Sequence, residues 1–331
     1  MRQRFFGAKM ITIVPDYYSD FKCAMNRCRH TCCAGWEIDI DEDSLEFYSG
    51  LPKKIREDLF RGIKQNTDPP SFQMQENGRC FFLDDNGLCK LILKYGEDIL
   101  CDICADHPRF RNYFGNTEEI GLGLCCEAAG RLILLRESPM KLVTLEDDGE
   151  NEPETPEDQE AVSQMAEIRA ELIRTAQNRA LPIAERVEAI GASFGFDPGF
   201  SAAETARYML TLERMDENWA DLLKLLISSG ISQEQTETFC SENEICFEQF
   251  LVYLLFRHIP AALDDGDLPG HVAFCIAMWK VTAMLCAADS ASESRAAQAD
   301  RIINICRMFS SEIEYSDENP QKLISWLKTG I

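Results

Sequence analysis

The distribution of cysteine constrains this chain more than any other feature of its sequence. Fifteen cysteines occur in 331 residues, and ten of them lie between Cys23 and Cys126. Lys9 interrupts the apolar N-terminal segment and no small-residue cleavage site follows, so we expect no secretion signal and a cytoplasmic protein. In such a chain, clustered cysteines indicate metal binding or redox chemistry rather than a disulfide framework.

The ten clustered cysteines fall into four groups: Cys23, Cys28, Cys32 and Cys33; Cys80 and Cys89; Cys101 and Cys104; and Cys125 and Cys126. Thiolates three or four residues apart can bind one metal because a short turn brings their sulfurs together. Both zinc and iron–sulfur clusters use four thiolates, so the spacing leaves the metal open. We interpret the five remaining cysteines as buried structural thiols: Cys240, Cys246, Cys275, Cys286 and Cys306.

Two alternatives stay open within these groups. Cys101-x-x-Cys104 could be a redox pair, although the His107-Pro108 that follows is more typical of a short turn, and His107 could ligate or simply pack near a site. Asn86-Gly87 predicts a hairpin turn between Cys80 and Cys89. These two cysteines can share a site only if the chain bends after Leu88.

Charge and hydrophobic periodicity divide the chain. Nine acidic residues and no basic ones lie between Glu146 and Glu160, and the net charge of −23 is concentrated in the second half, which carries −20. This acidity disfavours nucleic acid and anionic membranes as partners, and no apolar run reaches the ~18–20 residues that span a bilayer. We therefore expect neither a nucleic-acid-binding nor a membrane protein.

The predicted fold is mainly α. It comprises a small, irregular, cysteine-rich metal-binding domain with a short hairpin (1–143), an acidic linker or loop (144–160) and an all-α bundle of six to eight helices (161–331). Apolar residues at steps of three and four predict the bundle helices. In the first domain we expect short helices, the first capped by Asp43 or Ser44: Asp43–Tyr48, Pro52–Gln65 and Cys126–Arg136.

Several blocks of the first half occur in an order that resembles a known family. They are Cys23-x4-Cys28-x3-Cys32-Cys33-Ala-Gly-Trp36, Cys80-Phe-Phe-Leu-Asp-x4-Cys89, Cys104-x2-His107-Pro108-Arg109 and Cys125-Cys126-Glu127-Ala-Ala-Gly-Arg131. Over about residues 13–140 they resemble the flagellin lysine-N-methylase family, which is similar to the CxxCxxCC cysteine-cluster proteins that chelate zinc or iron. The chain departs from the family pattern by His107 for tyrosine, Cys126 for proline, an inserted Gly130 and an extra Cys101.

The resemblance implies methyl transfer from S-adenosylmethionine to a lysine of a protein, with flagellin as the first substrate to consider. It further implies a [4Fe–4S] cluster, with zinc as the alternative, bound by a subset of eight matching cysteines: Cys23, Cys28, Cys32, Cys33, Cys80, Cys89, Cys104 and Cys125. Arg109 and Arg131 would hold the carboxylate of the methyl donor and, with Glu127, form the catalytic set; Asp102 and Asp106 are further candidate bases. The competing hypothesis is a non-catalytic zinc- or iron-binding or electron-transfer protein. The oligomeric state stays undetermined.

Overall fold

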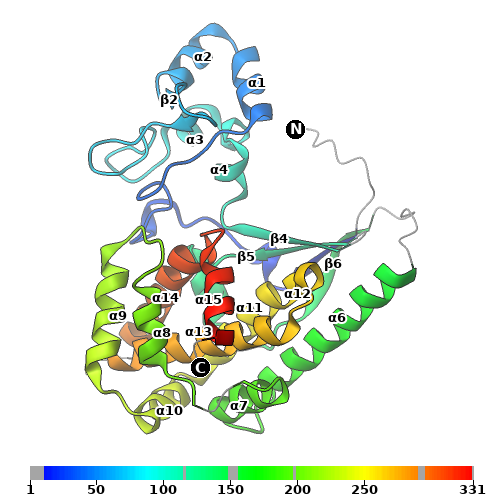
Figure 1. Ribbon diagram of the computed structural model, residues 1–331. Coiled ribbons are helices and arrows are strands. Elements are labelled where there is room, and N and C mark those ends of the chain that lie inside the picture. The colour runs from blue at the N-terminus through cyan, green and yellow to red at the C-terminus, as the bar shows by residue number, and fades with distance from the viewer. Residues whose placement is uncertain (1–10, 115–116, 148–155, 197–198, 290–294, 330–331) are drawn as a thin grey trace. The chain divides into compact units, whose positions relative to one another are not determined.

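The chain divides into two compact units (Figure 1). The computed structural model describes residues 11–114, 117–147, 156–196, 199–289 and 295–329. Within these, unit 1 comprises Lys22–Arg109, and unit 2 comprises residues 11–21 and 110–329. We describe each unit by itself.

Unit 1 consists of short elements joined by irregular backbone. They are η2 (Met25–Arg27), α1 (Glu42–Gly50), α2 (Lys53–Phe60), β2 (Ile63–Lys64), β3 (Ser71–Phe72), α3 (Lys90–Tyr95), η3 (Glu97–Ile99) and α4 (Asp102–Asp106). Asp41, not Asp43 or Ser44, caps α1, because its carboxylate accepts from the N–H of Ser44 at 2.7 Å. Tyr48 anchors α1 in the core by donating its hydroxyl to the carbonyl of Ile99 at 2.9 Å.

Unit 2 contains a four-stranded sheet that the sequence analysis did not predict. Its strands are β1 (Ile11–Pro15), β4 (Arg109–Phe114), β5 (Thr117–Leu122) and β6 (Leu142–Asp147), in the order β4-β5-β1-β6. β1 pairs in parallel with β5 and antiparallel with β6. A short 3-10 helix, η1 (Tyr18–Asp20), follows β1.

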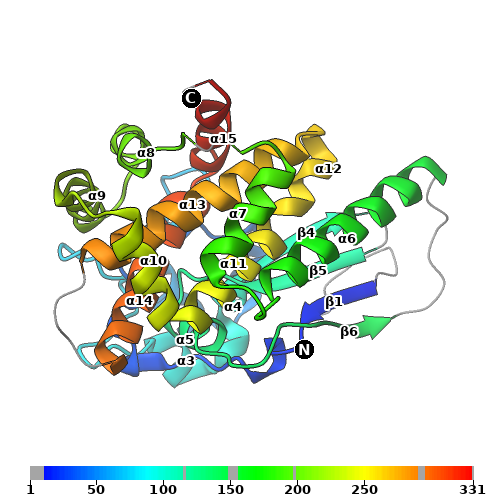
Figure 2. The ribbon, with the colours of Figure 1, turned by 90° about the horizontal axis from the view of Figure 1, so that it is seen from below.

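The helices of unit 2 supply most of its core. They are α5 (Glu127–Leu134), α6 (Pro156–Ala176), α7 (Ile183–Ser193), α8 (Ala202–Met209), α9 (Glu217–Ser229), α10 (Gln233–Glu242), α11 (Glu244–His258), η4 (Ile259–Ala261), α12 (Ala262–Asp265), α13 (Leu268–Ala288), α14 (Arg295–Phe309), the π-helix η5 (Ser310–Glu314) and α15 (Asn319–Thr329). Figure 2 shows α11 and α13 in the middle of this helical layer. Most residues of both are buried, so they form the centre of the unit.

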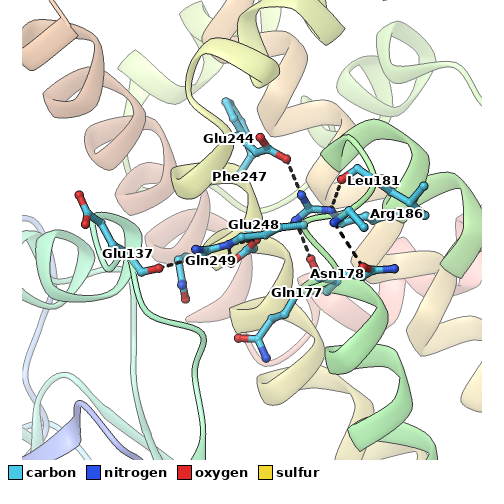
Figure 3. Close-up of polar contacts among 12 residues, drawn as sticks. Glu137, Gln177, Asn178, Leu181, Arg186, Glu244, Phe247, Glu248 and Gln249 are labelled. Atoms are coloured by element: carbon cyan, nitrogen blue, oxygen red, sulfur yellow. Dashed lines mark hydrogen bonds and ion pairs between the residues drawn. The ribbon is translucent and has the colours of Figure 1, made fainter.

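A buried ion network joins three of these helices (Figure 3). Arg186 of α7 donates from Nη1 to Glu248 of α11 at 2.7 Å, and neither side chain is exposed at all. Arg186 also donates to the carbonyl of Leu181 at 2.7 Å and to that of Ala176, at the end of α6, at 3.1 Å. Because the guanidinium and the carboxylate are both paired, the network can lie in an apolar core.

The predicted mainly α fold is confirmed in its helical content, whereas the predicted boundaries differ from the observed ones. Residues 110–143, assigned to the cysteine-rich domain, belong to unit 2, and the region beyond residue 143 is not purely α because β6 enters the sheet. The predicted linker (144–160) begins inside β6 and ends inside α6; residues 148–155 lie outside the described residues. The parallel partner of β1 is remote in sequence, which explains why local patterns missed the sheet.

Among the described residues, one helix, α13, is long and apolar enough to cross a membrane by length and composition. It lies largely inside unit 2, with Phe274, Met278 and Leu285 fully buried. A core helix passes the same test, so α13 is weak support for a membrane span.

Candidate metal centre

Four predicted ligands lie in the irregular segment that opens unit 1. Cys23 and Cys32 are exposed, whereas Cys28 and Cys33 are partly buried. Trp36 Nε1 donates to the carbonyl of Cys32 at 2.6 Å. Of the four, Cys33 is the cysteine that packs against the core of unit 1.

Five cysteines gather in that core, and we call them the thiol core: Cys33, Cys80, Cys89, Cys101 and Cys104. Cys80 and Cys101 are buried, and the other three pack against the same apolar cluster. The N–H of Cys80 donates to the carbonyl of Cys33 at 2.8 Å, which holds two distant segments together. Cys101 immediately precedes α4 and its thiol is hydrogen-bonded to that of Cys104. Three of the four sequence groups therefore meet.

The chain bends after Leu88, which was the condition for Cys80 and Cys89 to share a site. Asp84 closes the turn, since its Oδ1 accepts from the N–H of Asn86 at 2.9 Å and of Leu88 at 2.8 Å. Cys89 then caps α3, so the backbone turns into a helix where a hairpin strand was expected. The predicted hairpin is reduced to an isolated bridge between Leu83 and Cys89.

Hydrogen bonds and burial act in opposite directions on the thiols. The Cys32 thiol, Thr31 and the charge of Arg79 lower the pKa of Cys33 to about 7 against the effect of burial. The hydrogen bond from Cys104 likewise lowers the pKa of Cys101. Burial raises the pKa of Cys80 to about 11. Within the thiol core, Cys33 and Cys101 are thus the most readily ionised sulfurs.

The side chains of the thiol core are of the type that binds a metal, but they are not arranged around one point. All its cysteines are free thiols, and four or five thiolates suit zinc or an iron–sulfur cluster. However, within the described residues no three Cys, His, Asp or Glu side chains are arranged to hold a metal ion. Binding would therefore require the thiol side chains to rotate toward one point.

His107 packs against an aromatic ring in unit 1. Its ring lies edge-on to that of Trp36, with 5.6 Å between centroids. Burial and the nearby charge of Arg109 lower the pKa of His107 to about 4, so the imidazole is neutral at pH 7. A thioredoxin-like redox pair would follow a strand and open a helix. Here α4 begins directly after Cys101, but the element before it is η3 and not a strand.

Cys125, the eighth predicted ligand, lies in unit 2 between β5 and α5. Its thiol hydrogen-bonds the hydroxyl of Tyr315 and lies close to the guanidinium of Arg257. Burial nevertheless raises the pKa of Cys125 to about 12. The N–H of the preceding Leu124 donates to the hydroxyl of Tyr253 at 3.3 Å.

These partners belong to a buried polar group that we call the Glu314 cluster: Tyr253, Arg257, His258, Glu314 and Tyr315. The Glu314 carboxylate, fully buried at the end of the π-helix, accepts from the Tyr253 hydroxyl at 2.6 Å and lies 2.7 Å from His258 Nε2. Arg257 donates to Tyr253 at 2.9 Å and covers the ring of Tyr315 at 5.4 Å. π-helical turns are frequent at functional sites.

The charge of Arg257 and the hydrogen bond from His258 hold the pKa of Glu314 at about 2, below its ordinary value despite burial. Burial lowers the pKa of His258, so its neutral form is favoured. The cluster therefore combines an ionised carboxylate, a guanidinium and two neutral tyrosines beside Cys125.

Two of the predicted catalytic residues, Glu127 and Arg131, form ion pairs. Arg131 pairs with Asp300 of α14 at 2.7 Å and with Glu127, one turn earlier, at 3.3 Å. Arg109, at the end of unit 1, donates to the carbonyl of Asp106 at 3.4 Å. The structure thus brings Glu127 and Arg131 together, and places Arg109 in the other unit.

Sequence reasoning missed the Glu314 cluster. It assigned no function to any of the five members. The available signal was Tyr253 with Arg257 and His258 about one turn later, polar residues that end an apolar run of the helix. The five scattered cysteines, by contrast, are all buried inside unit 2, as predicted for structural thiols.

Comparison with known families gives a match in the helical region. Residues 202–331 match the FliB lysine N-methylase C-terminal domain. This region is similar to that domain over less than half of the chain. It contains α8 to α15 and all five members of the Glu314 cluster. The predicted resemblance to the lysine-N-methylase family is confirmed, although this domain lies in the half for which no motif had been recognised.

Three curated proteins show the same relationship. The lysine-N-methylases of Salmonella choleraesuis (strain SC-B67) and Salmonella typhimurium (strain LT2) are each 28% identical over 137 residues, covering 38% of this chain. The match spans 33% of the length of both proteins. The flagellar biosynthetic protein FliU of Salmonella muenchen is 27% identical over 137 residues, which is 79% of that protein. No solved structure matches the chain.

Proposed function

We propose that this protein is a protein-lysine N-methyltransferase that uses S-adenosylmethionine. The observation that carries the proposal is the FliB C-terminal domain at residues 202–331, supported by relatives named lysine-N-methylase. A bond forms between the lysine nitrogen and the donor methyl carbon as the carbon–sulfur bond breaks. The amine attacks only when neutral, so the enzyme must accept its proton or lower its pKa.

We further propose that the thiol core is the metal centre of this enzyme. Cys33, Cys80, Cys89 and Cys104 are family-matching positions that pack in one core, and their sulfur chemistry fits a [4Fe–4S] cluster, with zinc as the alternative. An iron with an open position would supply a site for the amino and carboxylate groups of the methyl donor. Fifteen free cysteines are consistent with a cytoplasmic location, where thiols stay reduced.

The proposed substrate is a lysine-bearing protein, and flagellin is the first to test. The name FliU of one relative connects that protein to flagellar biosynthesis. The second half of this chain carries a net charge of −20, which would attract a basic segment and raise the rate of encounter.

The deciding experiment combines metal analysis with a methylation assay on one preparation. Protein purified without oxygen should contain iron and sulfide and show the broad absorption near about 400 nm of thiolate-ligated clusters. Incubation with labelled S-adenosylmethionine and flagellin should yield methyl-lysine by mass spectrometry. Calorimetry measures the binding of S-adenosylmethionine to the same preparation.

Cys80→Ser tests the metal centre, and Cys275→Ser in α13 is its matched control because both thiols are buried. We expect loss of metal and activity in the first variant and retention of both in the second. Metal-loaded protein that neither binds the donor nor methylates any lysine would favour a metal-binding or electron-transfer protein. A colourless preparation that contains stoichiometric zinc would show that the thiol core is a structural zinc site and not an iron–sulfur cluster.

A further inference from the structure

We infer that Tyr253, Arg257 and Tyr315 are positioning residues that fix the sulfur of Cys125. These three residues, which we call the Cys125 socket, belong to the region that matches the FliB C-terminal domain, whereas Cys125 lies outside that region in the sequence. The inference rests on the proposed function in one respect: Cys125 would serve as a metal ligand only if the chain is the metal-dependent methylase.

The Cys125 socket contacts two consecutive residues, Leu124 and Cys125. Tyr253 accepts the N–H of Leu124 at 3.3 Å and so fixes the backbone just before Cys125. The Tyr315 hydroxyl hydrogen-bonds the Cys125 thiol and fixes the side chain. Two tyrosines from separate elements therefore restrain one turn, which is more than burial of a small thiol requires.

The two tyrosines are themselves rigidly held. Tyr253 donates to the ionised, fully buried Glu314 and accepts from Arg257. Arg257 lies over the ring of Tyr315 and over that of Phe110 at 4.5 Å. The backbone N–H of Tyr315 donates to the carbonyl of Ser310 at 3.2 Å, which ties it to the π-helix. A hydrogen-bond network satisfied in this way locks the side chains that it supports.

Such support is the usual arrangement around a functional sulfur. Partners that touch a ligand orient it and adjust its properties, and hydrogen bonds to sulfur change the potential of a cluster. Cys275 in the bundle contrasts with Cys125, because its thiol donates to a backbone carbonyl, that of Leu254 at 3.4 Å, and not to a side chain. The structure therefore treats Cys125 differently from a cysteine that only fills space.

The test measures the accessibility of Cys125 in the metal-free full-length protein. Tyr315→Phe and Tyr253→Phe each remove one hydroxyl, and Tyr208→Phe in α8, whose hydroxyl donates to the carbonyl of Lys322 at 3.4 Å, is the matched control. Native protein is alkylated with iodoacetamide, and modification of each cysteine is followed by mass spectrometry. We expect Cys125 to react about fivefold faster in either variant, the effect of losing one ordinary hydrogen bond on local opening.

The comparison of Cys125 with other buried cysteines distinguishes loss of positioning from destabilisation of the whole protein. Faster labelling of Cys125 with unchanged Cys275 and Cys306 supports the inference. Labelling that stays within about twofold of the wild type, or that rises equally at all three cysteines, overturns it. Because this readout needs neither metal nor donor, it separates failure of the inference from failure of the methylase proposal. If the wild type methylates lysine, Tyr315→Phe should also lower that rate while Tyr208→Phe leaves it unchanged.

Discussion

Replacing Glu248 by alanine should destabilise the protein by about 3–5 kcal/mol. The variant removes the carboxylate that accepts from Arg186 Nη1 at 2.7 Å and from Arg179 Nη2 at 2.8 Å. The side chain of Arg186 is fully buried, so water cannot replace the lost partner. In the variant, Arg186 still donates to two backbone carbonyls and pairs with Glu244. The loss of stability is therefore smaller than for a buried charge without any partner.

Glu244→Ala is the matched control for this prediction. Glu244 also pairs with Arg186, but 39% of its side chain is exposed, so water compensates and we expect a loss of about 1 kcal/mol or less. Urea denaturation of the full-length variants, followed by far-UV circular dichroism, measures both free energies. Loss of ~3–5 kcal/mol is a large share of the ~5–15 kcal/mol that stabilises a typical domain. Equal losses in the two variants would show that burial of the pair does not govern its contribution.

Three further outcomes are expected. If unit 1 binds the proposed metal, a chelator should make residues 22–109 sensitive to limited proteolysis while the helices of unit 2 resist, because metal binding would supply folding energy. A resistant unit 1 would mean that its apolar core suffices. The pKa of Glu314 is depressed from 4.5 to about 2, so its contribution is present above pH 4.5 and is lost as the pH falls toward 2; Glu314→Gln should flatten acid unfolding in that window, and an unchanged profile would argue against the assignment. Association with a lysine-bearing substrate should slow as salt is added, and a rate independent of salt would contradict steering by the −20 charge.

The sequence identified the features that depend on neighbours along the chain. Periodicity predicted α11 and α13 because helix contacts join residues three and four apart. The prediction that the five later cysteines are buried in the bundle is confirmed. The ordered cysteine blocks pointed to the lysine-N-methylase family, although the matching domain lies at residues 202–331.

Tertiary structure decided the features that join distant segments. β1 finds its parallel partner in β5, and no local pattern specifies that pairing. Spacing grouped the cysteines, but packing selected Cys33 and Cys101 as members of one core with Cys80. The contact of Leu124 with Tyr253 spans 129 residues. Such contacts depend on which apolar faces bury each other, and burial is a property of the whole folded chain rather than of any segment.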